Sequence, residues 1–351
     1  MSEYSIGKVF TSDKTTYQAI DQLLEQEGIR RDNNLDYTCA MYNNDDEVIA
    51  TGSCFSNTLR CLAVSHQHQG EGLMNQIVTH LINEQFERGN SHIFLYTKTS
   101  TSQFFASLGF HEIARIEGKI SFMENQRTGF ANYLANLIAC SPVPLATQRV
   151  AAIVMNANPF TLGHLYLVEK AASENDLVHL FIVSEDKSLV PFAVRKQLVE
   201  QGVAHLNNVI CHESGSYIIS SATFPSYFQE NDNAVIESNA MLDLQIFTRI
   251  ATALDIQRRY VGDEPFSRVT NIYNQIMQDK LPEQGIECVI VPRKGVNEQI
   301  ISASAVRELI KNGDFTTMKQ MVPTSTYQFF TSEAAKPVIA RIQATDNVRH
   351  Y

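Results

Sequence analysis

Two different patterns of hydrophobic and polar positions follow one another along this chain. In the first, apolar residues at helical spacing in "TTYQAIDQLLEQEGI" predict a helix over residues 15–29. Alternating runs on either side of the turn "NNDD" predict a β-hairpin in "YTCAMYNNDDEVIATGSCF". The other elements predicted here are strands over 57–65 and 92–98, helices over 72–88 and 102–110, and a last strand. This segment therefore predicts a mixed α+β domain.

In the second pattern, uninterrupted apolar strands alternate with helices. The strands are predicted over 150–156, 177–184, 258–262 and 287–293, with short candidates in "NVICHES" and "SYIIS". The helices are predicted over 163–173, 192–205, 235–253, 269–278 and 303–311. Apolar strands that alternate with helices indicate a parallel sheet covered on both faces.

The two patterns are separated by "NQRTGFANYLANLIACSPVPLATQ", residues 125–148. It predicts one apolar helix followed by two close prolines, which do not fit inside a helix or a central strand. We therefore expect a first domain over 1–124, a linker with a helix over 125–148, and a second domain over 149–351.

Composition and charge narrow the class of protein. The 351 residues are long enough for two cores, and a net charge of −10 argues against a nucleic-acid partner. No apolar run approaches the ~20 residues of a membrane helix, and "MSEYSIGKVFTSDK" lacks the pattern of a secretory signal. The six cysteines are scattered without a C-x-x-C pair, which argues against a zinc site and fits a reducing compartment. We expect a cytoplasmic protein without a membrane partner.

The turn after the first strand of the second domain carries candidate chemistry. Ligands of open parallel sheets bind beyond the carboxyl ends of the strands, where "NANPFTLGH" lies. Pro159 suits a sharp turn, and Gly163 allows a ligand close to the backbone. His164 falls in the first turn of a helix, where free N–H groups favour an anion, and the Thr161 hydroxyl could point at the same anion. A plain strand–turn–helix corner is the alternative interpretation.

A second candidate element is "ISASAVRELI" near the end of the second domain. Ser302 and Ser304 precede a helix that carries Arg307, so hydroxyls, N–H groups and a guanidinium could converge on phosphate. The preceding "PRKG" adds Arg293 and Lys294. Serines that only cap the helix, and solvated cations, are the alternatives.

The stretch "YVGDEPFS" follows another strand at the same edge. Gly262 could admit a nucleotide, and Asp263 or Glu264 could contact ribose or magnesium. A solvated acidic turn explains the same residues. The sequence itself assigns no metal ligand.

Together these elements resemble the nucleotidyltransferase superfamily, whose signatures are (H/T)-x-G-H and I-S-x-(S/T)-x-x-R. The resemblance covers about residues 149–323 and implies a Rossmann-like, doubly wound parallel α/β domain. It implies that Thr161, His164 and Arg307 are catalytic, in an attack on the α-phosphorus of ATP that releases pyrophosphate. The residues that it assigns to ATP binding are Asn156, Asn158, Pro159, Phe160, Thr161, Gly163, His164, Gly262, Asp263, Arg293, Ser302, Ser304 and Arg307.

The first domain resembles GNAT-type acetyltransferases over about residues 2–122. "QHQGEGL" matches (R/Q)-x-x-G-x-G/A at Gln67, Gly70 and Gly72, and "FFASLGF" is typical of the end of such domains. Small residues there let backbone N–H groups hold the pyrophosphate of a coenzyme-A-like group. A plain glycine-rich turn is the alternative.

The order of a GNAT-like domain and an adenylyl-transfer domain resembles the [citrate (pro-3S)-lyase] ligase family. The matching stretches are "NANPFTLGHLYLVEKAA", "VSEDKSLVPFAVRKQLV", "YVGDEPFSRVTNIYN" and "ISASAVRELI". The resemblance implies that acetate and ATP, with Mg²⁺, give acetyl-AMP and pyrophosphate. The thiol of a coenzyme-A-like group on the citrate lyase acyl carrier protein then takes the acetyl group.

Two other functions remain open at the level of sequence. One is a nucleotidyltransferase that adenylylates a phosphorylated cofactor precursor, such as phosphopantetheine or nicotinamide mononucleotide. The other is a GNAT acetyltransferase whose second domain only senses nucleotide.

Overall fold

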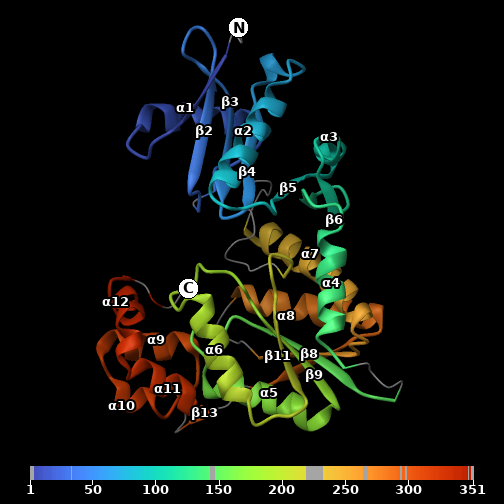
Figure 1. Cartoon of the computed structure of the whole chain (residues 1–351), viewed down its shortest axis with the longest axis vertical. Coiled ribbons are helices and arrows are strands. Elements are labelled where there is room, and N and C mark those ends of the chain that lie inside the picture. The colour runs from blue at the N-terminus through green and yellow to red at the C-terminus, as the bar shows by residue number, and fades with distance from the viewer. Residues whose placement is uncertain are drawn as a thin grey trace. The chain divides into compact units, whose positions relative to one another are not determined.

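The computed structural model describes residues 4–32, 34–142, 147–218, 232–263, 268–292, 295–296, 299–346 and 348. Figure 1 shows the chain coloured from its N-terminus to its C-terminus. The chain divides into an N-terminal unit (Met1–Asn132 and Thr223–Leu242) and a C-terminal unit (Tyr133–Ala222 and Asp243–Tyr351). The inclusion of Thr223–Leu242 in the first unit was not foreseen, and the domain limits at 124 and 148 stay a prediction.

The N-terminal unit is built on a seven-stranded sheet in the order β1-β2-β3-β4-β5-β7-β6. Its strands are β1 (Ser5–Lys8), β2 (Tyr37–Tyr42), β3 (Val48–Phe55), β4 (Thr58–Val64), β5 (Phe94–Lys98), β6 (His111–Ile116) and β7 (Ile120–Glu124). Its helices include α1 (Lys14–Gln26), α2 (Leu73–Glu87) and α3 (Ser102–Ser107), with short 3-10 turns η1 (His66–His68) and η2 (Thr99–Thr101). The predicted helices and central strands are confirmed, with ends that differ by a few residues.

The hydrophobic pattern of the sequence does not predict all the strands at the two edges of this sheet. β1, "SIGK", has exposed residues at both ends and no hydrophobic alternation. At the other edge, the single strand predicted after α3 is a hairpin of β6 and β7. Short edge strands pair on one side only and carry a weak hydrophobic signal, which explains both omissions.

Helices α2 and α1 cover opposite faces of the N-terminal sheet. Cys39 of β2 packs in one core cluster with Ile77 and Leu81 of α2. Its neighbour Ala40 belongs to the cluster on the other face, with α1. A Cβ on Gly52 of β3 would stand 2.7 Å from the side chains of Ile77 and Leu81, so α2 packs directly on the backbone there.

The C-terminal unit contains a five-stranded parallel sheet in the order β10-β9-β8-β11-β12. Its strands are β8 (Val150–Met155), β9 (Leu177–Ile182), β10 (Val209–Glu213), β11 (Arg258–Gly262) and β12 (Glu287–Val291), with a separate pair β13 (Gly295–Val296) and β14 (Gln299–Ile300). The helices that follow these strands are α5 (Leu162–Glu174), α6 (Phe192–Val203), α7 (Asp232–Ala253), α8 (Arg268–Lys280) and α9 (Ala303–Asn312). The part of α7 up to Leu242 is assigned to the N-terminal unit, and the rest to the C-terminal unit. The predicted parallel α/β sheet is confirmed.

Helices lie on both faces of this parallel sheet. Residues of β8 and β9 form one core cluster with α5, α6 and α9. On the other face, the guanidinium of Arg259 on β11 stacks over Phe247 of α7, with its Cζ 4.2 Å from the ring centroid. This arrangement is the predicted doubly wound fold.

The remaining elements agree only in part with those that the sequence predicts. Beyond α9 the chain forms α10 (Phe315–Met318), α11 (Thr324–Phe330), η4 (Glu333–Ala335) and α12 (Lys336–Gln343), which gather near α9 in Figure 1. The helix predicted within 125–148 is α4 (Gly129–Ala139), and η3 (Pro282–Gln284) precedes β12. The described part of "SYIIS", residues 216–218, is a turn and bend rather than a strand.

The strand order of the C-terminal sheet reverses at one point. From β8 the chain moves outward to β9 and β10, and it then returns to the other side of β8 for β11 and β12. The direction in which successive strands are added to the sheet therefore reverses between β8 and β11, although all the strands are parallel. In open α/β sheets, ligands bind beyond the carboxyl ends of the strands at such a reversal.

Candidate active site

The turn from β8 into α5 ends in a capping box. Thr161 is the N-cap of α5, and its hydroxyl accepts the His164 N–H at 3.3 Å. Its own N–H donates to His164 Nδ1 at 3.1 Å. Thr161 is only 1% exposed, so the hydroxyl that was expected to face an anion is engaged at the start of the helix. It orders the helix N-terminus.

His164 is oriented by the same cap and by a neighbouring ring. Its Nδ1 lies 2.9 Å from the Thr161 hydroxyl, and its ring lies nearly parallel to Phe160, with centroids 5.9 Å apart. Because Nδ1 accepts the Thr161 N–H, we assign the proton of the neutral ring to Nε2. The half-buried imidazole therefore has an N–H donor at Nε2, a group that suits a phosphate oxygen.

The middle of the turn is held by the loop that precedes α6. Asn156 Nδ2 donates to the Ser188 hydroxyl at 2.9 Å. Asn158 Oδ1 accepts the Val190 N–H at 3.0 Å, and Asn158 is 3% exposed. Pro159 follows a cis peptide bond and is buried. These predicted site residues shape the turn, and of the four turn residues 156–159 only Asn156 is exposed.

Gly163 brings the two sequence motifs together. A Cβ at this position would stand 3.3 Å from the carbonyl oxygen of Ile301. Ile301 immediately precedes Ser302, the N-cap of α9. The sequence interpretation placed a ligand against Gly163, whereas the structure places the backbone before α9 there. The starts of α5 and α9 consequently lie side by side.

The serines of the late motif lie at the start of α9. The Ser302 hydroxyl accepts the Ala305 N–H at 3.1 Å and lies 3.0 Å from the Ser304 hydroxyl. Both serines are half-buried. Since a helix N-terminus favours negative charge, the adjacent starts of α5 and α9 form an electropositive site lined by hydroxyl groups.

Arg307 lies beneath this site and is 2% exposed. Its Nη1 donates to the carbonyl oxygen of Asn158, and its Nε donates to that of Val348, each at 2.6 Å. Burial lowers the pKa of Arg307 to about 10, so the side chain is positively charged at neutral pH. The structure thus connects Arg307 to the β8–α5 turn through the backbone.

Arg195 was missed by sequence reasoning. It lies on α6 with 0% exposure, and its Nη1 donates to the carbonyl oxygen of Asn156 at 2.8 Å. Burial lowers its pKa to about 10. The only signal in the sequence was an arginine among the apolar residues of "VPFAVRKQLV", and an arginine on a helix is usually solvated.

The end of β11 lies on the other side of the point where the strand order reverses. Gly262 is half-buried, and a Cβ there would meet no atom within 4 Å, so there is open space beside the backbone. Asp263 is exposed, and its N–H donates to the carbonyl oxygen of Val291 at 2.9 Å. Glu264 and Arg293 lie outside the described residues.

A magnesium site built from protein ligands alone was not found in the described part of the chain. There, no group of three or more histidine, cysteine, aspartate or glutamate residues is placed to hold a metal ion. Mg²⁺ bound together with a nucleotide takes most of its ligands from phosphates and water. Among the predicted site residues that the structure describes, Asp263 carries a carboxylate.

The glycine-rich turn of the N-terminal unit is open. Gly70 and Gly72 have φ values of +92° and +76°, in the left-handed region that favours glycine. A Cβ on either glycine would meet no atom within 4 Å. Gly72 is the N-cap of α2, and Gln67 lies exposed in the preceding 3-10 turn. The backbone therefore leaves space at this helix start.

Strands β4 and β5 separate next to this turn. They pair in parallel only at Thr58 with Phe94 and at Leu59 with Leu95, near the start of each strand. The rest of β4 follows β3 and leads into η1 and α2. The sheet thus opens between two parallel strands at the edge where the glycine turn lies.

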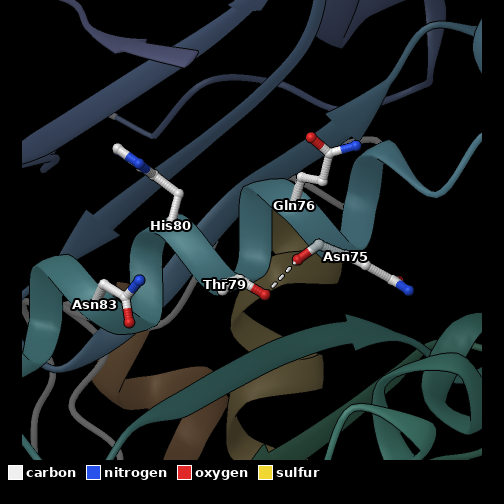
Figure 2. Close-up of a pocket in the computed structure, with 5 residues that line it drawn as sticks. All are labelled: Asn75, Gln76, Thr79, His80 and Asn83. Atoms are coloured by element: carbon white, nitrogen blue, oxygen red, sulfur yellow. Dashed lines mark hydrogen bonds between the residues drawn. The ribbon is translucent and has the colours of Figure 1, made fainter. Parts of the chain in front are cut away.

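A shallow polar depression of about 380 Å³ lies on the outer face of α2. Figure 2 shows its lining residues, and the Thr79 hydroxyl donates to the carbonyl oxygen of Asn75. The lining residues are Asn75, Gln76, Thr79, His80 and Asn83. They belong to one helix and include no predicted site residue, so the depression adds nothing to the candidate chemistry.

Within the described ranges, no helix is long and apolar enough to span a membrane.

Comparison with known proteins gives two family matches. Residues 150–330 match "Citrate lyase ligase C-terminal domain", and residues 5–112 match the "Acetyltransferase (GNAT) family". The chain is 37% identical to "[Citrate [pro-3S]-lyase] ligase" of Klebsiella pneumoniae over 90% of this chain and 93% of the relative. The proteins of the same name from Escherichia coli (strain K12) and Haemophilus influenzae are 36% and 32% identical. These matches cover 92% and 91% of this chain, and 92% and 96% of the relatives.

Proposed function

Because this chain belongs to the citrate lyase ligase family, we propose that it acetylates the thiol of a coenzyme-A-like group on the citrate lyase acyl carrier protein through an enzyme-bound acetyl adenylate. Family membership follows from the match over 150–330 and from relatives that are 32% to 37% identical along most of the chain. The chain is thus an enzyme, a ligase that activates citrate lyase by acetylation.

The observation that supports this site best is the junction of α5 and α9. Their N-termini lie side by side at Gly163 and Ile301, where the strand order reverses. The hydroxyl groups of Ser302 and Ser304 line the start of α9, and the charge of Arg307 lies beneath the turn. Helix N-termini, hydroxyls and a guanidinium fit the triphosphate of ATP.

The first step is the formation of acetyl-AMP. A carboxylate oxygen of acetate attacks the α-phosphorus of ATP, and the bond from that phosphorus to the bridging oxygen of pyrophosphate breaks. The Nε2–H of His164 donates to the phosphoryl oxygens as negative charge builds on them. Such a reaction requires mainly positioning and charge stabilisation from the protein.

Mg²⁺ accompanies ATP in this proposal and neutralises part of the phosphate charge. Asp263 at the end of β11 is the carboxylate nearest in sequence to the open space at Gly262. We assign it a contact with ribose or with the hydrated metal.

The second step transfers the acetyl group to the carrier. The thiolate attacks the carbonyl carbon of acetyl-AMP, the bond to the phosphate oxygen breaks, and AMP leaves. The open glycine turn at Gly70 and Gly72 and the gap between β4 and β5 suit the pyrophosphate and pantetheine parts of the prosthetic group. The N-terminal unit therefore binds the acceptor.

Product analysis tests this function. The full chain is incubated with ATP, Mg²⁺, acetate and deacetylated citrate lyase. We expect AMP, pyrophosphate and a reactivated lyase, each dependent on acetate. Formation of ADP and phosphate, or lyase reactivation without ATP, contradicts the acetyl-adenylate route.

The same experiment separates the two alternative functions. A nucleotidyltransferase acting on a cofactor precursor would release pyrophosphate with phosphopantetheine or nicotinamide mononucleotide and would ignore acetate. A GNAT enzyme with a nucleotide sensor would use acetyl-coenzyme A and release no pyrophosphate.

A further inference from the structure

Arg195 is the largest fully buried side chain of the described chain. Its guanidinium extends from α6 to the carboxyl ends of β8 and β9. Nη1 donates to the carbonyl oxygens of Asn156 and Val183, each at 2.8 Å, and Nε donates to that of Val190 at 3.0 Å. Nη2 donates to the carbonyl oxygen of Glu185. A single side chain thus joins two strand ends and the loop that leads to α6.

A buried guanidinium is a costly way to fill this space. Water solvates the charge better than the protein interior does, and carbonyl dipoles compensate only in part. Although burial lowers the pKa of Arg195 to about 10, the group stays charged at neutral pH. A well-packed apolar side chain is often as stable as a buried ionic group. The presence of a cation therefore indicates a requirement other than stability.

That requirement is visible at Ala157, which lies between two carbonyl groups held by arginines. Arg195 binds the carbonyl oxygen of Asn156, and Arg307 binds that of Asn158. Ala157 has a φ of +51°, which a residue other than glycine adopts at an energetic cost. The two guanidinium groups, one from α6 and one from α9, thus hold the turn in a conformation that its sequence does not favour.

The direction of one peptide follows from this contact. The cis peptide of the described chain is that between Asn158 and Pro159, so the peptide between Asn156 and Ala157 is trans. In a planar trans peptide the N–H points opposite to the C=O. The N–H of Ala157 therefore points away from Arg195.

We propose that Arg195 is a positioning residue for adenylyl transfer, which holds the β8–α5 turn so that the α5 N-terminus and His164 meet the phosphates of ATP. This inference rests on the proposed function. Arg195 is 0% exposed, so it acts through the turn and does not touch the substrate. Its charge, together with that of Arg307, also places positive potential behind the turn in a chain of net charge −10.

The test uses Arg195→Lys in the full chain and follows acetate-dependent exchange of labelled pyrophosphate into ATP. Lysine keeps the charge, but its compact ammonium cannot reproduce the rigid fork that reaches four carbonyls. A displaced turn misaligns the reacting groups, so we expect kcat to fall about 10²-fold. KM for ATP should change much less, because Arg195 does not contact ATP.

Val199→Ala is the matched control. Val199 lies on the same helix with 0% exposure, so its truncation destabilises the same core without touching the turn. At a temperature where both variants are folded by circular dichroism, we expect Val199→Ala to keep the kcat of the wild-type protein. If Arg195→Lys matches Val199→Ala in kcat and KM, Arg195 is merely structural and the inference is overturned.

A double-mutant cycle tests the route through the turn. Ser188→Ala removes the independent contact with the Asn156 side chain. Its effect on kcat should be smaller in the Arg195→Lys background than alone, whereas that of Val199→Ala should be the same in both backgrounds. If Arg195→Lys does not fold, Ser188→Ala decides alone, and an unchanged kcat for it refutes the proposed role of the turn.

Failure of the proposed function looks different. A wild-type protein without acetate-dependent exchange refutes acetyl-AMP formation. A wild-type protein that exchanges normally, with variants that differ only in stability, refutes the role of Arg195.

Discussion

At the residue scale, substitution can separate the cap that His164 forms with Thr161 from the catalytic role proposed for it. Asparagine can place an acceptor near the position of Nδ1 and so keep the cap with Thr161, but it lacks Nε2. We expect His164→Asn to keep its melting temperature and to lose about 10²-fold in kcat for pyrophosphate exchange. His164→Ala should lose activity and also about 0.5–1.5 kcal/mol of stability, because the Thr161 N–H loses its acceptor at Nδ1 while the His164 N–H still donates to the Thr161 hydroxyl. If His164→Asn keeps the kcat of the wild-type protein, His164 only caps the helix and has no catalytic role.

Arg307 also lends itself to a paired test at this scale. Arg307 lies on α9, whose start carries the serines proposed to bind the phosphates of ATP, and Arg307→Lys cannot bind the carbonyl oxygens of both Asn158 and Val348. Because this loss displaces α9 itself, we expect a raised KM for ATP and a lower melting temperature. Lys311→Ala is the control, because Lys311 binds the carbonyl oxygens of Thr345 and Asp346 but not the turn. The control should lower stability and leave KM unchanged. Equal KM values in both variants would remove Arg307 from the site.

The sequence predicted which residues gather at the site, but not how each one is used. Thr161, Gly163 and Ser302 do lie at the starts of α5 and α9, and Arg307 follows one turn into α9. The hydroxyl of Thr161 caps a helix through the His164 N–H, three positions away, and the sequence does not decide between this use and contact with a ligand. The space beside Gly163 is filled by the backbone at Ile301, more than a hundred positions away, so the local sequence pattern does not reveal it. Arg195 was missed because its carbonyl partners are brought together only by the fold, whereas an arginine on a helix is usually solvated.

At the scale of elements, β9 and β10 carry a pH-sensitive pair. His179 Nδ1 lies 2.9 Å from His212 Nε2, and both side chains are buried. Burial lowers the pKa of His179 from 6.5 to about 3, with a smaller contribution from His212, and that of His212 from 6.5 to about 4. Both rings are therefore neutral in the folded protein at neutral pH.

The sign of the pH dependence follows from these values. Below pH 6.5 the unfolded chain binds protons that the folded chain does not, so stability falls as the pH decreases towards the folded pKa values. We expect each ring to cost at most about 1.4 kcal/mol per pH unit in this window. Urea unfolding at pH 7 and pH 5 measures the loss. A His179→Phe/His212→Leu variant should show a flatter pH dependence, and an identical slope would exclude the pair as its source.

The elements that sequence predicted well are those with strong periodicity. Buried parallel strands and the helices between them follow from uninterrupted apolar runs. The strand β1 and the hairpin of β6 and β7 lack that signal, and helices α10 to α12 are short. The reversal between β8 and β11 depends on strand order, which the predicted strands did not specify.

At the scale of the whole molecule, the two proposed steps belong to different units. Gly70→Asp puts a carboxylate where a phosphate group is expected, so it should impair acetylation of the carrier and spare pyrophosphate exchange. Gly89→Asp is the control, since Gly89 has a φ of +83° and a Cβ there would meet no atom within 4 Å, as at Gly70. Backbone strain and charge are thus matched. If both variants acetylate carrier equally, the glycine turn does not bind the acceptor.

The division of the chain also limits what a fragment can do. A fragment from about residue 147 to 351 contains the described candidate residues for acetyl-AMP formation, and we expect it to exchange pyrophosphate when folded. It also carries residues 223–242, which belong with the missing N-terminal unit. We therefore expect it to be less stable than the full chain, which circular dichroism will check before activity. A folded fragment that acetylates carrier as well as the full chain would contradict the division of the two steps.

The discontinuity of the N-terminal unit has a consequence for biosynthesis. Its last segment, Thr223–Leu242, is translated after β8, β9 and β10 of the other unit. A nascent chain therefore cannot complete its first unit before much of the second has emerged from the ribosome, although domains usually fold in order of synthesis. Because the seven-stranded sheet is complete by Glu124, ribosome-arrested chains should gain protease resistance in that sheet early, and a further gain in the first unit is expected only when residue 242 has left the exit tunnel.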